Sequence, residues 1–280
     1  MRPVFVFCEG PHDIAFLGRL LKFNGATPYK ESLRNYPSPL AGLIINRFQS
    51  RNIEEARFRS SGPFALDCPP ILETAYTLPS PERLLLLYRC GGDKQDEAVK
   101  ALLKTPIDLS GESNAPDNRI PSFGVVFVND ADMSPVSETL DRVRTAYCEV
   151  LKPILSKVDQ LQANGTIREN GFACGCLIFS DSEEQAGTLE SIIEPIMRKQ
   201  QSARHDDADV LVSKHATVDT AAGNTKRPSK KRKALLTAAG QIDFPSCSLS
   251  VIIRDTAALK WEDLKNDPRC TKCVEVLTRV

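Results

Sequence analysis

The sequence predicts an α/β fold: a parallel, doubly wound sheet flanked by helices, with an insertion after the first helix. Two observations lead to this prediction. Four short runs are apolar on both alternating faces, which is typical of strands buried on both sides. A helical pattern follows each of them. The runs are residues 4–8, 84–88, 124–128 and 174–179.

Each expected helix has apolar residues at steps of three and four. In the third and longest pattern, we expect Ser134 to be the N-cap, Pro135 to take the first helical position and Pro153 to kink or divide the helix. Pro195 is expected to interrupt the fourth. The apolar positions are Ile14, Leu17, Leu20 and Leu21; Val99, Leu102 and Leu103; Val136, Leu140, Val143, Tyr147, Val150, Ile154, Val158 and Leu161; and Leu189, Ile192, Ile193 and Ile196.

Two segments lie outside this alternation of strands and helices. Residues 24–83 contain several prolines and few clear periods, so we expect an insertion or lid there. Residues 204–229 are mostly polar and are expected to form a flexible connection. Both segments are expected to belong to a single domain that covers residues 1–280.

Composition narrows the class of protein. The chain has 280 residues, with 36 basic and 36 acidic side chains, which does not support a general polyanion-binding surface. No apolar run approaches the ~20 residues that span a bilayer, and the signal-peptide pattern is absent. We therefore expect a cytoplasmic protein with no membrane partner. The lone Cys270-x-x-Cys273 pair predicts two thiols on a C-terminal helix rather than a zinc site.

An acid stands at the end of the first predicted strand, which is the functional edge of an open α/β sheet. This acid is Glu9, and the Gly10 that follows it permits a tight turn with room for a phosphate or a metal ion. Asp13, in the first turn of the next helix, can point to the same place. Alternatively, it only complements the helix dipole.

Two acids follow the third predicted strand. Asp130 and Asp132 are two residues apart, so both can reach one divalent ion. Hard oxygen ligands favour Mg²⁺ or Mn²⁺. The alternative is a polar loop with solvated acids. Sugar-nucleotide transferases also hold a metal ion with such a pair, so the motif alone does not fix the reaction.

Further charged groups occur late in the chain. Glu190 and Glu194 share a helix face if the helix survives Pro195; the alternative is an ordinary exposed acidic face. A basic run follows, and either Lys231 or Lys233 can lie near a phosphate while other cations contact nucleic-acid backbone. A solvated, flexible segment is the alternative. The cations expected to bind nucleic acid are Lys226, Arg227, Lys230, Lys231 and Arg232.

Together these motifs resemble the Toprim domain, which occurs in topoisomerases, bacterial primases, RNA-maturation nucleases and OLD-family nucleases. The resemblance rests on Glu9-Gly10 with Asp13, on the glycine-bearing residues 91–94, and on the Asp-x-Asp motif that begins at Asp130. It covers most of the chain outside the expected insertion. The fold that it implies is a Toprim-like, Rossmannoid sheet.

The later residues are similar to the stand-alone Toprim branch related to OLD nucleases, which is often tied to anti-phage defence. These residues are Gly187, Leu189 and Glu190, followed by the cationic helix start near Lys233. The first helix departs from the family, because Pro11-His12 replace the commoner small or basic residues there. His12 is therefore a further residue expected to line the site.

The resemblance implies a role for each charged residue. Lys233 would neutralise charge on the phosphoryl group, and Lys231 is the alternative lysine for this role. Glu9 would act as a metal ligand or as a general acid and base. The implied catalytic residues are Glu9, Asp130, Asp132 and Lys233, and the implied metal-holding residues are Glu9, Asp13, Asp130, Asp132 and Glu190.

The implied activity is that of a Mg²⁺- or Mn²⁺-dependent nuclease that cuts RNA, tRNA included, or DNA. The chain is too short to add the tyrosine-bearing domain of a topoisomerase, and it lacks the zinc module of bacterial primases. The resemblance also implies a defence effector held by a partner such as a regulatory ATPase, and it leaves a homo-oligomer open. Two alternatives stay open: a metal-dependent sugar-nucleotide transferase that uses Asp130 and Asp132, and a catalytically inactive Toprim scaffold or sensor.

Overall fold

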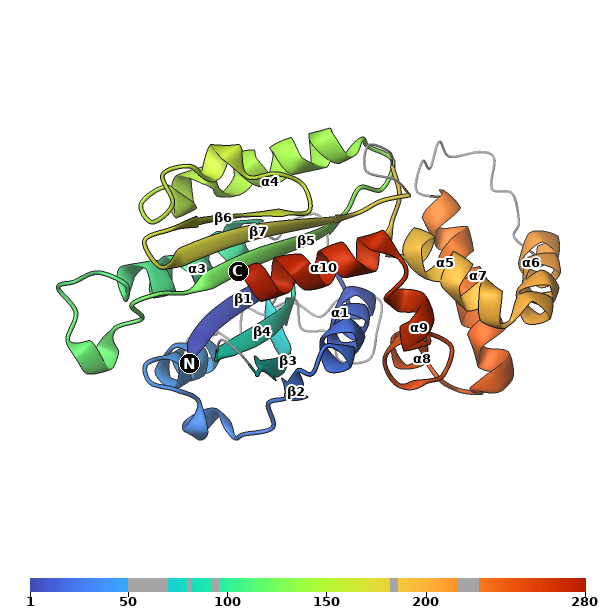
Figure 1. The fold of residues 1–280 in the computed structure, drawn as a ribbon, viewed down its shortest axis with the longest axis horizontal. Helices are drawn as coiled ribbons and strands as arrows, with labels where there is room; N and C mark the ends of the chain where they lie inside the picture. Colours follow the sequence, from blue (N-terminus) through green and yellow to red (C-terminus); the bar gives the residue numbers. More distant parts are fainter. Residues whose placement is uncertain (50–69, 80–81, 92–95, 182–185, 216–226) are drawn as a thin grey trace.

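Within the part of the chain that the structure describes, seven strands form one open, mixed sheet. The computed structural model describes residues 1–49, 70–79, 82–91, 96–181, 186–215 and 227–280. The strand order is β2-β3-β4-β1-β5-β7-β6 (Figure 1). The strands are β1 (Arg2–Cys8), β2 (Thr27–Pro28), β3 (Ile71–Leu78), β4 (Arg83–Arg89), β5 (Gly124–Asp130), β6 (Gly165–Glu169) and β7 (Phe172–Phe179).

The four strands predicted from apolar runs are confirmed, and they form the parallel centre of the sheet. β1 pairs in parallel with β4 on one side and with β5 on the other, and β5 pairs in parallel with β7. The sheet is not parallel throughout, because β3 and β6 run antiparallel to β4 and β7. These two strands are partly exposed and lack the continuous apolar runs of the central four.

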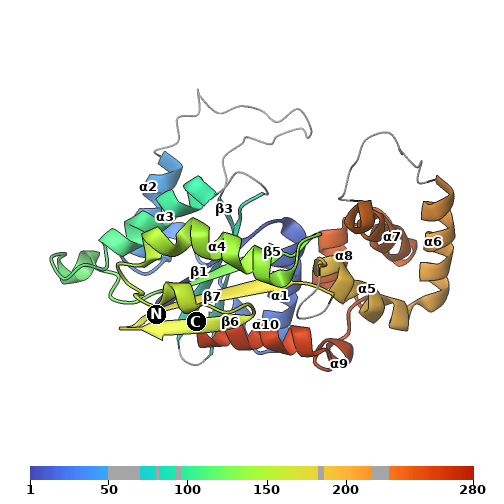
Figure 2. The ribbon, with the colours of Figure 1, turned by 90° about the horizontal axis from the view of Figure 1, so that it is seen from above.

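Helices cover both faces of the sheet, and the sheet divides the core in two (Figure 2). Val4 and Val6 of β1 face one core, whereas Phe5 and Phe7 face the other. The first core is completed by α1 (Pro11–Phe23), α5 (Leu189–Gln200), α8 (Leu249–Asp255) and α10 (Pro268–Arg279). The second is completed by α2 (Leu40–Gln49), α3 (Asp96–Asp108) and α4 (Val136–Leu151).

The predicted start of the third helix is wrong by one residue. Pro135 has an extended backbone, with ψ of 150°, so it is the N-cap and the helix begins at Val136. Ser134 therefore lies outside the cap. The helix ends at Leu151, before Pro153, and the apolar pattern continues only through a short 3-10 turn, η4 (Val158–Gln160). Pro153 thus divides the long helical pattern, which is one of the two outcomes that the sequence predicts.

The predicted interruption of the fourth helix is also wrong, since α5 runs through Pro195 without a break. A proline inside a helix removes one backbone hydrogen bond. Burial of Ile192, Ile193 and Met197 on the sheet side offsets this loss. Glu190 and Glu194 therefore do belong to one continuous helix.

Part of the expected insertion belongs to the sheet. Residues 24–83 supply β2, β3 and α2, together with a short 3-10 turn, η1 (Leu33–Asn35). Much of the expected flexible connection at 204–229 is helical, because α6 (Ser202–His215) covers its first part and α7 (Arg227–Asp243) begins near its end. Residues 50–69, 80–81 and 216–226 lie outside the described residues.

The remaining elements are short or follow α7. They include η3 (Pro116–Asn118) and α9 (Trp261–Leu264). Cys270 and Cys273 are buried on α10, as predicted, and burial raises the pKa of the Cys273 thiol to about 12. Both thiols thus act as small apolar groups. None of the described helices is both long and apolar enough to cross a membrane.

We predict that Gly175→Ala destabilises the protein. An added Cβ at this position of β7 would lie 2.8 Å from Val276 Cγ1 and 2.9 Å from Val280 Cγ2, in a well-packed core. The free energy of unfolding should fall by about 1–3 kcal/mol, measured as a shift of the urea midpoint. As a control, Gly42→Ala on α2 meets nothing within 4 Å and should stabilise by about 0.5–1 kcal/mol. Equal midpoints for the two variants would contradict this packing.

Candidate functional site

Glu9 and Asp130 meet at the carboxyl edge of the parallel strands. Glu9 follows β1, and Asp130 ends the neighbouring strand β5. Because the two strands are parallel and adjacent, their ends lie at the same edge. The Asp130 backbone N–H donates to Glu9 Oε1 at 3.3 Å. Two acids that are 121 residues apart in sequence are thus in contact, as the strand pattern predicts.

Asp13 lies in the first turn of α1 and is only 6% exposed. Its Oδ2 accepts a hydrogen bond of 2.8 Å from the backbone N–H of Gly10, the N-cap residue. Burial raises the pKa of the Asp13 carboxyl to about 7; the Gly10 hydrogen bond opposes this rise, and the charges of Glu9 and Glu190 add to it. Asp13 therefore does both things considered from the sequence: it caps its helix and it faces the other acids.

Asp130 connects the sheet edge to α5. Its Oδ1 accepts a 2.9 Å hydrogen bond from the backbone N–H of Leu189, the first residue of that helix. A carboxylate at a helix N-terminus is stabilised by unpaired N–H groups and by the helix dipole. Even so, the pKa of Asp130 is well above its ordinary value, because of burial first and then of the charges on Asp13, Glu9 and Glu190.

Glu190 is the most deeply buried of these acids, with 1% of its surface exposed. Its Oε1 lies 3.5 Å from His12 Nδ1 and 3.2 Å from Lys233 Nζ. Burial by itself would raise the pKa of Glu190, but the contacts with His12 and Lys233 outweigh it and lower the pKa to about 2. Glu190 therefore carries its negative charge at neutral pH.

Lys233, not Lys231, is the lysine that the structure places beside the acids. Burial lowers the pKa of Lys233, but the charges of Glu190, Asp130 and Asp13 outweigh this effect and raise it. Lys231 instead lies 3.4 Å from Asp209 on α6. The two lysines are two residues apart on α7, so they face different neighbours.

The backbone of Asp132 has a role that the sequence did not predict. Asp132 has a left-handed backbone with φ of 54°, and its N–H and C=O both pair with Gly187, at 2.7 and 2.9 Å. Gly187 has φ of 150°, and an added Cβ would collide with the backbone of Asp181. This pairing holds the loop before α5 against the end of β5. Sequence reasoning missed this backbone role, although a local signal for it, a glycine shortly before a helix, is present in the chain.

Two of the five cations expected to bind nucleic acid, Lys231 and Arg232, are paired with acids of the protein. Arg232 Nη1 lies 3.1 Å from Asp181 Oδ1, and Arg232 Nε lies 3.2 Å from Glu194 Oε2. Its guanidinium also donates to Ser191 Oγ at 2.5 Å. Arg232 therefore fastens α7 to α5, which the sequence did not reveal. Arg227 and Lys230 belong to α7, and Lys226 lies outside the described residues.

The donor chemistry of the site fits a hard divalent cation. Carboxylate oxygens are the ligands that Mg²⁺ and Mn²⁺ prefer, and Glu190 Oε2 is buried without a hydrogen-bond partner among the described residues. The mutual repulsion of Glu9, Asp13 and Asp130 is also what a bound cation relieves. Across the described ranges, no three His, Cys, Asp or Glu side chains are grouped closely enough to hold an ion together.

Comparisons with known proteins give little beyond this geometry. No protein-family model matches the chain, and no curated protein matches it. The crystal structure of a hypothetical protein from Pyrococcus horikoshii OT3 is similar over 100% of this chain and 95% of that one, with 16% sequence identity and a TM-score of 0.46. A similarity at this level says nothing about function.

We predict that Lys233→Met destabilises the protein in a pH-dependent way. Removing one partner of a buried ion pair costs about 3–5 kcal/mol, and partial exposure of Lys233 reduces the expected loss to about 1–3 kcal/mol. Because the pKa of Glu190 is lowered from 4.5 to about 2, the pair stabilises the folded state fully above pH 4.5. This stabilisation is lost as the pH falls toward 2.

Urea unfolding at several pH values between 3 and 7 measures this difference. Lys231→Met is the matched control, since it breaks a half-exposed pair with Asp209 and should cost at most about 1 kcal/mol. A Lys233→Met effect that is as small as the control, or that does not shrink below pH 4.5, would show that Glu190 does not depend on Lys233.

Proposed function

We propose that this protein is a Mg²⁺- or Mn²⁺-dependent nuclease of the Toprim type, which hydrolyses phosphodiester bonds in RNA, tRNA included, or in DNA. One observation carries the proposal. Glu9, which follows β1, interacts at one edge of the sheet with four residues from α1, β5, α5 and α7. These residues are Asp13, Asp130, Glu190 and Lys233. Acids and a lysine that are gathered in this way, with shifted pKa values, are typical of a phosphoryl-transfer site and not of an ordinary protein surface.

In this proposal the acids bind the cation and the lysine stabilises the phosphoryl group. Glu9, Asp13, Asp130 and Glu190 would hold the cation, with Asp132 as the further acid that the resemblance implies. A bound cation supplies charge neutralisation and Lewis-acid activation for an in-line displacement at phosphorus. Lys233 stabilises negative charge that develops on the phosphoryl oxygens. The hydrogen bonds from the Asp130 and Leu189 N–H groups fix the orientation of Glu9 and Asp130 in advance.

The wider role is proposed from the resemblance alone. A cytoplasmic anti-phage effector, restrained by a partner such as a regulatory ATPase, is consistent with the paired state of Lys233 and Arg232. Both cations are neutralised by acids of the same chain, so substrate must compete with these contacts. Self-association of the chain belongs to the same proposal.

We predict metal-dependent cleavage that Glu9→Gln abolishes. Purified wild-type protein is incubated with mixed tRNA, single-stranded DNA and plasmid, with Mg²⁺, Mn²⁺ or EDTA. Loss of this carboxylate should reduce the rate at least 100-fold, because it removes a charge that the site needs for cation binding or proton transfer. Glu138→Gln, an exposed acid in the first turn of α4, is the control and should keep full activity. Cleavage that persists in EDTA or in Glu9→Gln would refute the proposal.

We also predict that the protein is stabilised by divalent cations without any substrate. At 100 times the dissociation constant, a cation that binds only the folded state stabilises it by about 2.7 kcal/mol. Thermal unfolding with Mg²⁺ or Mn²⁺ should therefore occur at a higher temperature than with NaCl of equal ionic strength. Asp130→Asn should lose this response, yet it should be at least as stable as the wild type without divalent cations, because it removes one repelling charge. An equal cation response in both proteins would place the ion elsewhere.

A further inference from the structure

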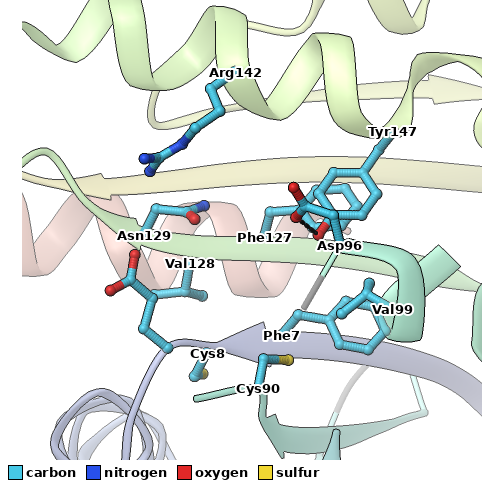
Figure 3. Close-up of a pocket in the computed structure, with 11 residues that line it drawn as sticks. Phe7, Cys8, Cys90, Asp96, Val99, Phe127, Val128, Asn129, Arg142 and Tyr147 are labelled. Atoms are coloured by element: carbon cyan, nitrogen blue, oxygen red, sulfur yellow. Dashed lines mark hydrogen bonds between the residues drawn. The ribbon is translucent and has the colours of Figure 1, made fainter. Parts of the chain in front are cut away.

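A concave feature lies beside the acids, against the face of the sheet that α3 and α4 cover. It is a cavity of about 140 Å³ between α3 and α4, above the ends of β1 and β5 (Figure 3). Helices α1 and α5 pack against the opposite face of the sheet. The cavity is therefore separate from the contact between Glu190 and Lys233, but it opens at the same edge.

The inner wall of the cavity is apolar and aromatic. Phe7, Val99, Phe127 and Tyr147 line it. The rings of Phe127 and Tyr147 are stacked, with centroids 4.1 Å apart and an interplanar angle of 14°. A cavity of about 150 Å³ with apolar walls accommodates a benzene ring. The volume thus suits a single flat aromatic ring system.

The rim of the cavity carries polar groups that can recognise the edge of such a ring by hydrogen bonds. Asp96 Oδ1 accepts a hydrogen bond of 2.6 Å from the Tyr147 hydroxyl, which fixes both side chains. The Asn129 amide makes no hydrogen bond to another described side chain, and the exposed Arg142 forms no ion pair with a described acid. In Figure 3 the Arg142 guanidinium extends from α4 toward Asn129.

One residue belongs to both features. Glu9 lines the cavity, and it also accepts the hydrogen bond from Asp130. Asn129 directly precedes Asp130 on β5. A phosphate held at the acids would therefore lie next to the cavity mouth, where the base of the same nucleotide can enter.

We propose that this cavity holds one unpaired nucleobase of the substrate strand while its phosphate lies at the acids; this inference rests on the proposed nuclease function. An amide offers one donor and one acceptor to the edge of a base, and a guanidinium stacks on a base or binds its phosphate. A base inside a duplex cannot enter such a cavity without leaving its partner. The substrate class is therefore single-stranded nucleic acid, or an unpaired segment of a folded one.

Binding of mononucleotides tests the cavity without any cleavage. AMP, CMP, GMP and UMP are titrated calorimetrically into the protein in EDTA, with ribose 5-phosphate as the probe that lacks a base. At least one nucleotide should bind the wild type at least tenfold more tightly than ribose 5-phosphate does. Asn129→Ala should reduce this preference at least fivefold, and Arg142→Ala should weaken nucleotide binding at least threefold. Lys152→Ala, which removes an exposed cation at the end of α4, should change neither.

The outcomes separate this inference from the nuclease proposal. Equal binding of nucleotides and ribose 5-phosphate, or a base preference that survives in Asn129→Ala, would overturn the cavity assignment even if the protein cleaves nucleic acid. Nucleotide binding that depends on Asn129, with no metal-dependent cleavage of any substrate, would leave the cavity as a nucleotide site and refute only the nuclease. If cleavage occurs, duplex oligonucleotides should be cut at least tenfold more slowly than single strands of the same sequence.

Discussion

Glu190 is almost completely buried, and one of its carboxylate oxygens has no hydrogen bond within the described residues. A buried charge of this kind is costly unless cations surround it. The Lys233 ammonium from α7 supplies a compensating charge, and the His12 ring from α1 adds a contact of 3.5 Å. Glu190 thus links both helices to α5. The contacts of α1 and α7 with α5 therefore balance negative charge at this edge of the sheet. Arg232, the residue before Lys233, likewise pairs with acids, namely Asp181 and Glu194.

The central strands and their helices could be predicted because each leaves a strong local pattern. β1, β4, β5 and β7 are buried on both faces, so they read as continuous apolar runs. The edge strands β3 and β6 are half exposed, and their sequences show no such run. The behaviour of Pro195 depends on tertiary packing, since a local rule for proline cannot weigh the burial of the helix face. The same limit explains why the polar segment of α6 was expected to be a flexible connection.

The acids of the candidate site could be predicted from their places at strand ends, since parallel neighbours bring those ends together. Glu9 and Asp130 are the clearest case. The choice between Lys231 and Lys233 could not be made from the sequence, because it depends on how α7 is rotated against α5. The same holds for Asp132, whose backbone pairing with Gly187 arises from a turn geometry that no residue spacing specifies. Asn129 and Arg142 leave no sequence signal at all, since each is a common surface residue until α3 and α4 enclose the space between them.

The central position of β1 has a consequence for how the chain is made. Its two partners, β4 and β5, begin only at Arg83 and Gly124. At synthesis rates of about 5–20 residues per second, roughly 6–23 seconds pass between the appearance of Cys8 and that of Gly124. Until Arg83 appears, β1 has neither of its strand neighbours, and both of its strand pairings join residues that are distant in sequence. The growing polypeptide thus exposes an apolar strand near the ribosome. We expect the yield of folded protein in cells to depend on chaperones that bind such exposed segments.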